Sequence, residues 1–419
     1  MTGALDRRAL ASLLERPELR RLLEVFNDRA EETRIVGGAV RNALLGRPVT
    51  EVDCTTTMLP DATVKRARQA GFKAVPTGIE HGTITVIVDG EPFEITTLRE
   101  DVETDGRHAV VHFGRDFARD ARRRDFTINA LSLGLDGQLY DYTGGEADLA
   151  ARRVRFIGDA RTRIREDFLR IMRFFRFHAE YAQGEPDAEG LAASGAERQG
   201  LSILSKERIR HELLKLLVAR RAEETIRILA EHGFLTGLLG GVAEFGRFGR
   251  VAAGDGDHPG AIWRLAALAV LVEEDAGRLR DELRLSNDEH RHLVAYARLL
   301  SLLKTRTLPL DAQAIRRLVA DHDPASLGLA LAAMAGEPVP VVHDEGRKAL
   351  ERYRSGAEPV PVFPLRGADL VEGGVPKGPK IGEMLAQARQ AWLAEGCRTD
   401  ADYARDLLRR VLEPGSRTG

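Results

Sequence analysis

Two carboxylates near the start of the chain have the spacing of a shared metal site. Glu51 and Asp53 stand two residues apart in the segment PVTEVDCTTT. On a β-strand, residues at i and i+2 point to the same face. Paired carboxylates on one face suit a hard divalent cation such as Mg²⁺. The spacing therefore predicts a Mg²⁺ site, or a site for a similar hard divalent cation, held by Glu51 and Asp53.

Two glycines precede these carboxylates. Gly37 and Gly38 lie between a short apolar run and a predicted helix that begins near Val40. Glycines at such a junction leave backbone N–H groups available to an anion, and the helix dipole adds positive potential there. Arg41, one turn into the helix, offers a guanidinium to the same phosphate. A phosphate site beside a metal pair predicts phosphoryl or nucleotidyl transfer.

The order of these parts, GGAVRN followed by EVD, resembles the nucleotidyltransferase superfamily with a DNA polymerase β-type palm. It is most similar to the bacterial branch that contains tRNA CCA-adding enzymes and poly(A) polymerases. That family usually has Asp where this chain has Glu51. Glu also offers carboxylate oxygens, but its side chain is one methylene longer than that of Asp. The resemblance therefore implies that Glu51 binds the metal, with its carboxylate farther from the backbone.

A second segment, RRDFTINA at 123–130, resembles a signature of the same family. Arg124 offers donors to a triphosphate or a ribose. Asp125 and Asn129 have two interpretations, because each can hydrogen-bond a sugar or anchor a turn. Phe126 and Ile128 are expected in the core.

A third segment, EDFLRIMRFFRF at 166–177, predicts the choice of base. If the segment is one helix, Asp167 and Arg170 are neighbours at i and i+3. One interpretation is an exposed salt bridge within the helix. The other is base recognition, because a carboxylate that accepts from an amino group and a guanidinium that donates to a ring nitrogen match cytosine and adenine. Guanine and uracil present the reverse pattern, so CTP and ATP would be admitted and GTP and UTP refused.

The same segment resembles the family's nucleotide-selecting motif E-D-x-x-R-x-x-R. Arg173 and Arg176 follow at steps of three and are expected to reach the sugar or phosphates of the nucleotide. The segment 205–217 (SKERIRHELLKLL) is similar to the helix that braces this motif. Its members Glu207, Arg208 and Glu212 are expected to form structural ion pairs.

Further candidate residues lie outside these motifs. Glu94, on the second strand of a predicted hairpin, is either a third acidic group near the metal or a charge on an exposed sheet face. The polar segment 99–114 is expected to be a functional loop, and the resemblance implies that it helps the pocket change from CTP to ATP. The tail segment 364–385 resembles the part of these enzymes that holds tRNA. Its predicted phosphate contacts are Arg366, Lys377 and Lys380.

The elements that must position these residues change type along the chain. Short strands mixed with helices occupy the first 155 residues, whereas helical spacing dominates afterwards. A clear hairpin is predicted from TITVIV at 83–88, the turn Asp89-Gly90 and FEITTL at 93–98. The expected fold is an α/β nucleotidyltransferase head with a polymerase β-type palm, followed by an all-helical neck, body and tail. The expected domains are the head at 1–155, the neck at 156–250, the body at 251–360 and the tail at 361–419.

Composition narrows the class of protein. The 419 residues have a formal net charge of −2, so any RNA-binding surface must be a local patch. Two cysteines are too few for a disulfide framework, and no apolar run reaches the length of a membrane span. These features, with no recognisable signal-peptide core, predict a cytoplasmic protein with no membrane partner.

The sequence thus predicts an enzyme that adds C, C and A to the 3′ end of tRNA from CTP and ATP, without a template and with release of pyrophosphate. Its expected partners are tRNA and the two nucleotides, and it is expected to be a monomer or a homodimer. Three alternatives stay open: a bacterial poly(A) polymerase, an enzyme that adds only CC, and an inactive RNA-binding protein that retains the palm.

Overall fold

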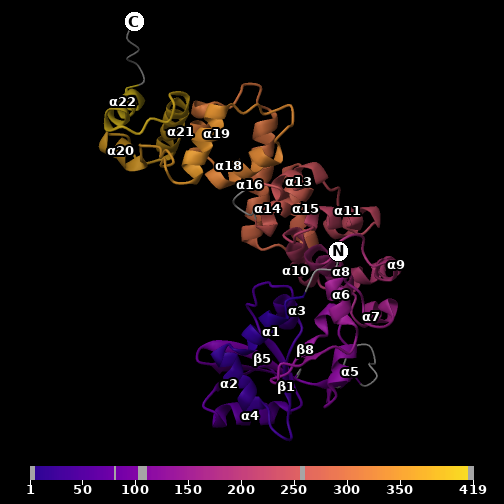
Figure 1. Ribbon diagram of the computed structural model, residues 1–419. Coiled ribbons are helices and arrows are strands. Elements are labelled where there is room, and N and C mark those ends of the chain that lie inside the picture. Colours follow the sequence, from indigo (N-terminus) through magenta and orange to yellow (C-terminus); the bar gives the residue numbers. More distant parts are fainter. Residues whose placement is uncertain (1–4, 80–81, 102–110, 255–259, 414–419) are drawn as a thin grey trace. The chain divides into compact units, whose positions relative to one another are not determined.

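The computed structural model describes residues 5–79, 82–101, 111–254 and 260–413. The chain forms two compact units, Met1–His232 and Gly233–Gly419. The first contains every sheet and the second is helical in its described part (Figure 1). The α/β head followed by helices, as expected from the sequence, is confirmed. The domain limits expected after residues 155, 250 and 360 stay predictions.

A seven-stranded sheet forms the centre of the head. Its strand order is β3-β4-β5-β2-β1-β8-β9, and β6 pairs separately with β7. Only β2 and β5 run parallel to each other among these paired neighbours. The strands are β1 Thr33–Val36, β2 Asp53–Thr56, β3 Lys73–Gly78, β4 Thr83–Val88, β5 Glu91–Thr97, β6 Arg99–Asp101, β7 Val111–Phe113, β8 Ser132–Leu133 and β9 Leu139–Tyr140.

The predicted hairpin is confirmed. In the pairing of β4 with β5, Val88 lies opposite Glu91 beside the turn, and Thr83 lies opposite Thr96 at the far end. The two turn residues Asp89 and Gly90 have φ values of 50° and 92°, as a type I′ turn requires. Burial alternates along β4, so every second side chain joins the core and the others face the opposite side of the sheet.

Helices cover one side of this sheet. α2 and α4 lie next to each other and pack against β1, β3 and β4 (Figure 1). The helices of the first unit are α1 Arg7–Leu14, α2 Pro17–Phe26, α3 Gly38–Leu44, α4 Pro60–Gln69, α5 Phe117–Arg122, α6 Gly145–Ala150, α7 Ala160–Glu166, α8 Leu169–Tyr181, α9 Ala188–Ala196, α10 Lys206–Leu217 and α11 Ala222–Glu231, with 3₁₀ turns at Thr127–Asn129 and Arg198–Ile203.

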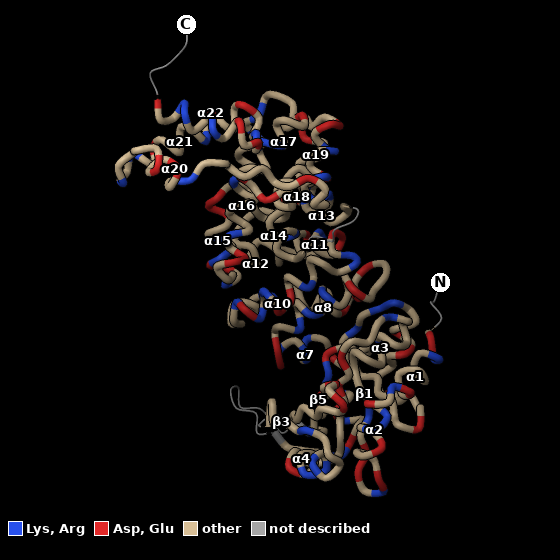
Figure 2. The backbone as a smooth tube through the Cα atoms, turned by 90° about the vertical axis from the view of Figure 1, so that its left-hand side faces the viewer, with Lys and Arg blue, Asp and Glu red and all other residues tan. Residues whose placement is uncertain are grey.

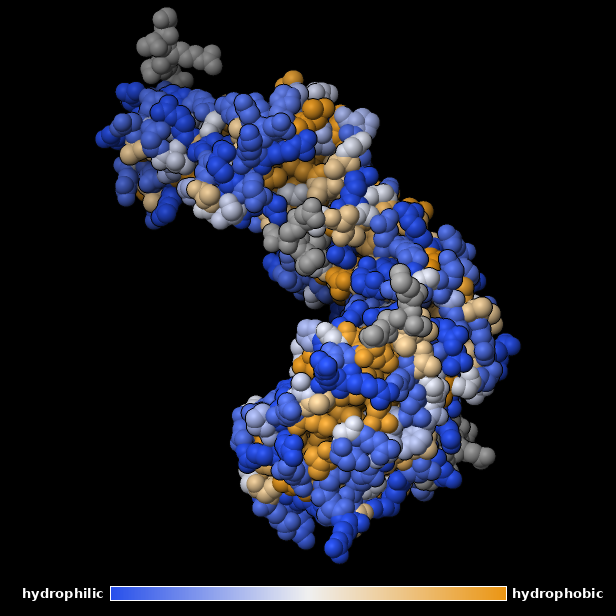
Figure 3. All heavy atoms as spheres, viewed as in Figure 1, coloured by the Kyte–Doolittle hydropathy of each residue, from blue (hydrophilic) through white to orange (hydrophobic). Residues whose placement is uncertain are grey.

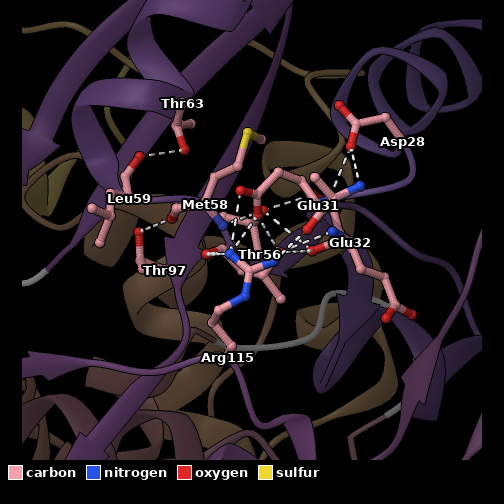
Figure 4. A network of polar contacts seen from close by, with 12 residues as sticks. Asp28, Glu31, Glu32, Thr56, Met58, Leu59, Thr63, Thr97 and Arg115 are labelled. Atoms are coloured by element: carbon pink, nitrogen blue, oxygen red, sulfur yellow. Dashed lines mark hydrogen bonds and ion pairs between the residues drawn. The ribbon is translucent and has the colours of Figure 1, made fainter.

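A polar network fixes one end of strand β2 (Figure 4). The Arg115 guanidinium contacts both carboxylate oxygens of Glu31, at 3.2 and 3.0 Å. Thr33 donates from its hydroxyl to the Thr56 hydroxyl at 2.8 Å, and Thr97 donates to the Met58 carbonyl at 2.7 Å. These bonds hold β1, β2 and β5 in register at the end of β2 opposite Asp53. Residues 102–110, which make up most of the predicted functional loop, lie outside the described residues.

The second unit is built from helices, with an apolar cluster around Trp392 near its end. Its helices are α12 Leu235–Leu239, α13 Phe245–Ala252, α14 Ala261–Ala269, α15 Glu273–Leu283, α16 Asn287–Lys304, α17 Ala312–Val319, α18 Pro324–Ala333, α19 Asp344–Arg354, α20 Gly367–Glu372, α21 Pro379–Ala394 and α22 Ala401–Leu412. Figure 3 shows a largely hydrophilic surface with apolar areas in both units. Among the described helices, none combines the length and hydropathy needed to cross a bilayer.

Four phenylalanines join the head segment RRDFT to helix α8. Phe126 is fully buried, and its ring centroid lies 4.9 Å from that of Phe156 and 5.3 Å from that of Phe177. Phe156 in turn stacks on Phe174 at 5.4 Å. The expectation that Phe126 belongs to the core is confirmed. This cluster fixes the distance between the sheet and α8.

We expect Phe126→Ala to lower the free energy of unfolding by about 3–5 kcal/mol, because it removes a fully buried ring and leaves a cavity. Urea denaturation followed by circular dichroism measures the change. The control is Ile203→Ala at a side chain that is 74% exposed, where the expected change is within about 0.5 kcal/mol. Equal stability of the two variants would mean that the aromatic cluster does not hold the head to α8.

Candidate nucleotidyltransferase site

The parallel pairing of β2 with β5 brings two carboxylates side by side. Asp53, the first residue of β2, stands opposite Glu94 in the register of the two strands. Both side chains are exposed, on the face of the sheet away from the buried residues of β4. Glu51 lies two residues before β2 begins and not within a strand, which corrects the expectation of an i and i+2 pair on one strand. Its charge still acts on Asp53.

The three acidic groups repel one another. Removal from water, followed by the charges of Glu94 and Glu51, raises the pKa of Asp53 above its ordinary value, and the nearby Arg124 opposes the shift. In the described part of the chain, no three potential ligands are close enough to form a ready-made metal cage. The donor chemistry nevertheless fits Mg²⁺, because a hard cation prefers carboxylate oxygens and relieves their repulsion.

Gly37 lies between strand β1 and helix α3, next to Arg124. It precedes α3 with φ of 66°, in the left-handed region that favours glycine. A Cβ atom at Gly37 would lie 3.4 Å from Nη1 of Arg124 and 3.5 Å from the carbonyl oxygen of Asn129. The backbone N–H of Gly37 donates to the Leu131 carbonyl at 3.0 Å. This N–H therefore already has a backbone acceptor, which corrects the expectation that it is free for a phosphate, and the positive φ is what favours glycine at this position. A nucleotide contact by Gly37 and Gly38 stays a prediction.

Arg124 reaches the site because a buried carboxylate holds it. Asp120 accepts from Nη2 and Nε of Arg124 at 3.1 and 3.3 Å, and from Nη2 of Arg123 at 2.6 Å. Asp120 is only 2% exposed. The sequence analysis did not single out Asp120. The signal available for it was the spacing, because Arg123 and Arg124 follow Asp120 at i+3 and i+4 near the end of a helix. Gly38 is the first residue of α3, and a Cβ atom there would lie 3.6 Å from Nη2 of Arg41.

Arg41 does not face the acidic side chains. Its guanidinium is buried and donates to the Asn42 side chain, to Oδ1 of Asn129 and, at 2.8 Å, to the Tyr181 hydroxyl. It also lies 4.0 Å from the centre of the Tyr181 ring. These protein partners favour a structural role for Arg41, and its contact with a phosphate stays a prediction. Arg41 joins α3 to α8.

Asp125 is the centre of a buried chain of charges between the head and α8. Its carboxylate accepts from the Asn129 amide at 3.1 Å, and from Nε and Nη2 of Arg173 at 2.8 and 2.7 Å. Burial alone would raise the pKa of Asp125, but Arg173 and the hydrogen bonds outweigh it and hold the pKa below its ordinary value. Of the two interpretations left open for Asp125 and Asn129, these bonds support the structural one.

Arg173 and Arg176 also have protein partners. Nη1 of Arg173 lies 3.6 Å from Glu212 on α10, and Nε of Arg176 donates to the same carboxylate. Glu212 is buried, so it acts as the brace that the sequence predicted. The sequence predicts that Arg173 and Arg176 reach the nucleotide. In this geometry both guanidiniums are instead directed at carboxylates of the head and of α10.

Asp167 and Arg170 do not form an ion pair within one helix. α7 ends at Glu166 and α8 begins at Leu169, and Asp167 between them is extended, with φ of −156°. The single helix expected over 166–177 is therefore wrong at its start. Asp167 accepts from Nη2 of Arg208 on α10 at 2.8 Å. Arg170 instead pairs with Glu166 and donates to the Arg163 carbonyl at 2.9 Å.

Both members of the predicted base-reading pair are only partly exposed, with 34% of the Asp167 side chain and 16% of the Arg170 side chain in contact with solvent. Charges of both signs lie along α7, α8 and α10 (Figure 2). Nη2 of Arg170 also contacts the Arg123 carbonyl at 3.4 Å, next to Arg124. That contact ties Arg170 to the segment that approaches Asp53. The structure thus places Asp53, Glu94, Arg124 and the predicted base-reading pair within the first unit.

The predicted RNA contacts lie in the second unit. Arg366 precedes α20, Lys377 lies in the turn before α21 and Lys380 is in the first turn of α21. All three side chains are exposed. Their contact with phosphate stays a prediction.

Comparisons with known proteins decide the family. Residues 33–155 match the poly A polymerase head domain, and residues 187–245 match a probable RNA and SrmB- binding site of polymerase A. The mitochondrial CCA tRNA nucleotidyltransferase 1 of Mus musculus is 35% identical over 401 residues, which cover 94% of this chain and 90% of the relative. The Danio rerio enzyme of the same name is 38% identical, covering 88% of this chain and 85% of the relative. The chain belongs to the CCA tRNA nucleotidyltransferase family.

Solved structures agree with this family. The CCA-adding enzyme of Bacillus stearothermophilus, in complex with CTP, has a TM-score of 0.71 and 26% identity, covering 94% of this chain and 98% of that chain. The Thermotoga maritima CCA-adding enzyme complexed with tRNA has a TM-score of 0.69 at 21% identity and shows the same fold. The family resemblance drawn from the sequence motifs is confirmed.

The electrostatics of the acidic face give a direct test. We expect Glu94→Gln to lower the pKa of Asp53, because it removes a neighbouring negative charge. Carboxyl ¹³C NMR titration of the metal-free protein measures this pKa. The control is Glu91→Gln on the same strand, since Glu91 pairs with Arg16 and should leave Asp53 unchanged.

The sign of the accompanying stability change follows from the same shift. A folded-state pKa above the ordinary value means that the folded protein binds the Asp53 proton more tightly than the unfolded chain does. Ionising Asp53 therefore costs stability as pH rises through the raised pKa, and Glu94→Gln should reduce that cost. An unchanged Asp53 titration in Glu94→Gln would show that the two carboxylates do not interact.

Proposed function

We propose that this chain adds C, C and A to the 3′ end of tRNA from CTP and ATP, without a nucleic-acid template and with release of pyrophosphate. The observation that carries the proposal is one connected site. Asp53 and Glu94 are paired in register, Arg124 stands beside them, and Arg170 contacts the carbonyl of Arg123, the preceding residue. This contact would link Asp167 and Arg170, which we propose to read the base, to the carboxylates that we propose to support nucleotidyl transfer.

The acidic face would hold the metal. Glu51 and Asp53, with Glu94 beside them, are the residues that would bind Mg²⁺, which when bound supplies positive charge against the nucleotide triphosphate. Arg124 has donors for the same triphosphate. In the reaction, a bond forms between the tRNA 3′-oxygen and the α-phosphorus, while the bond from that phosphorus to pyrophosphate breaks.

The neck would choose the base. Asp167 accepts a hydrogen bond from the exocyclic amino group of cytosine or adenine, and Arg170 donates to the adjacent ring nitrogen. Uracil and guanine place a carbonyl oxygen where the carboxylate needs a donor, so they meet a repulsive contact. Arg366, Lys377 and Lys380 would bind tRNA phosphates, with a strength that falls as salt rises.

Partners and location complete the proposal. The enzyme would bind tRNA, CTP and ATP and act as a monomer or a homodimer. We propose a cytoplasmic location; both cysteines are free and buried, which agrees with a reducing compartment. The names of the Mus musculus and Danio rerio relatives place those proteins in mitochondria. A fractionation of cells that express the full-length protein distinguishes the two.

Incorporation of labelled CTP and ATP into tRNA that lacks its 3′ CCA tests the activity. Wild type should add two C residues and one A. A poly(A) polymerase would extend with many A residues, a CC-adding enzyme would stop after two C residues, and an inactive RNA-binding protein would add nothing. We expect Asp53→Asn to lose incorporation of both nucleotides while still binding tRNA. Asp89→Asn, in the hairpin turn, is the control that should retain full activity, because Asn also tolerates positive φ.

The base-reading role gives a second test. We expect Asp167→Ala to use CTP and ATP roughly ten- to a hundredfold less well, since it loses a hydrogen bond to a charged group. The penalty on UTP and GTP should shrink at the same time, because the repelling carboxylate is gone. Steady-state incorporation of all four nucleotides by both proteins measures these ratios. An unchanged ratio of CTP to UTP use would exclude base recognition by Asp167.

A further inference from the structure

A cavity of about 450 Å³ lies within the first unit and outside the candidate nucleotidyltransferase site. Its lining comes from the end of α5, from residues 142–143 in the turn before α6, from residues 155–158 and α7, and from the start of α9. α7 and α9 pack against each other (Figure 1). None of the three carboxylates of the acidic face lines this cavity, and neither member of the predicted base-reading pair does. Its volume suits a ligand of the size of a mononucleotide.

One part of the lining has unused hydrogen-bond donors. Arg155 donates from Nε to the buried carboxylate of Asp148 at 3.0 Å, and among the described residues its Nη1 and Nη2 have no partner. A Cβ atom at Gly144 would lie 3.7 Å from Nη2 of Arg155, so the guanidinium ends beside the turn that contains Thr143. The Thr143 hydroxyl oxygen is buried and, within the described ranges, has no hydrogen-bond partner. A buried hydroxyl of this kind in the wall of a cavity is a candidate contact for a ligand.

Arg122 adds a further cation at the end of α5. Its neighbours Arg123 and Arg124 bind Asp120, whereas Arg122 has no hydrogen-bond or ion-pair partner in the described part of the chain. Arg122 is also exposed, so a ligand can reach it from solvent. Two guanidiniums and a hydroxyl suit a phosphate group, because they offer N–H and O–H donors to its oxygens.

The rest of the lining suits the other end of such a ligand. Asp187 accepts from the backbone N–H of Gly190 at 3.1 Å and caps α9, and Glu189 is exposed in the first turn of that helix. Their charges repel a polyanion such as an RNA strand, whereas their oxygens accept from hydroxyl or amino groups. Tyr142 adds an aromatic ring that a base can stack on. The cavity therefore suits a small molecule with a phosphate at one end and hydrogen-bond donors at the other.

We propose that this cavity is a second nucleotide-binding site, which takes a nucleoside monophosphate. Arg122, Arg155 and the Thr143 hydroxyl bind the phosphate, and the ribose or base donates to Asp187 or Glu189. The inference goes beyond the proposed function, because the cavity shares no residue with the acidic face or the base-reading pair. A binding assay without tRNA therefore tests it separately from the incorporation of CTP and ATP.

Isothermal titration calorimetry of the intact protein with AMP tests the site, in buffer with EDTA so that no metal-bound nucleotide contributes. Inorganic phosphate and adenosine each represent one half of AMP and are titrated in parallel. The variants are Thr143→Val and Arg122→Ala. The matched control is Arg119→Ala, because Arg119 is on the same helix as Arg122, is 63% exposed and does not line the cavity. The unfolding midpoint of each protein is measured alongside.

We expect AMP to bind wild type more tightly than phosphate or adenosine does, because AMP alone uses both ends of the cavity. Thr143→Val should weaken AMP binding roughly three- to tenfold through the loss of one hydrogen bond, and Arg122→Ala roughly tenfold through the loss of a charged contact. Thr143→Val keeps the shape of the side chain and removes an unpaired hydroxyl, so its unfolding midpoint should not fall. Arg119→Ala and Asp167→Ala should bind AMP as wild type does.

Four results would overturn the inference. Wild type that does not bind AMP at millimolar concentrations excludes the site. Equal AMP affinity in wild type, Thr143→Val and Arg122→Ala places the binding elsewhere. Weaker AMP binding in Asp167→Ala assigns AMP to the proposed site of nucleotidyl transfer. Adenosine that binds as tightly as AMP excludes a phosphate contact.

Discussion

The buried carboxylate of Asp125 is the contact on which the arrangement of the site depends. It lies in the head segment but accepts its strongest hydrogen bonds from Arg173 on α8. A buried charge without partners would cost several kcal/mol, so the head and the neck helix must stay together for Asp125 to remain ionised. The lowered pKa of Asp125, in which Arg173 outweighs burial, means that this stability is present above the ordinary pKa and is lost as pH falls through the folded value.

This buried pairing explains why the arginines of the nucleotide-selecting motif divide into two groups. Arg173 and Arg176 share Glu212 on α10, whereas Arg170 pairs with Glu166 at the end of α7. The pair on Glu212 sets where α8 lies relative to the sheet. In the proposed function, Asp167 and Arg170 read the base from the start of this fixed helix, as a binding site needs when no template strand positions the incoming base.

The sequence predicted the fold class and the chemistry of the site better than its contacts. The Asp-Gly hairpin and the helices after the head follow local rules of turn type and periodicity, which act within a few residues. The brace at Glu212 came from the family resemblance, because its partner Arg176 lies 36 residues away along the chain. The pairing of Asp53 with Glu94 depends on a parallel register between distant strands, and no local pattern specifies it. Arg41 shows the same limit, since its partner Tyr181 is 140 residues away along the chain.

Asp167 illustrates how a local exception to helical periodicity shapes the candidate site. Helical periodicity runs through 166–177, yet the chain breaks at Asp167 because this carboxylate accepts the N–H of Leu169 and so competes with the helical backbone. The break directs the carboxylate away from α8 and toward α10, where Arg208 meets it. Immediately after the break, α8 is anchored by buried side chains such as Ile171 and Phe174. In the proposed function, Asp167 reads the base from beside this anchored helix start, so its carboxylate would keep its direction through each addition.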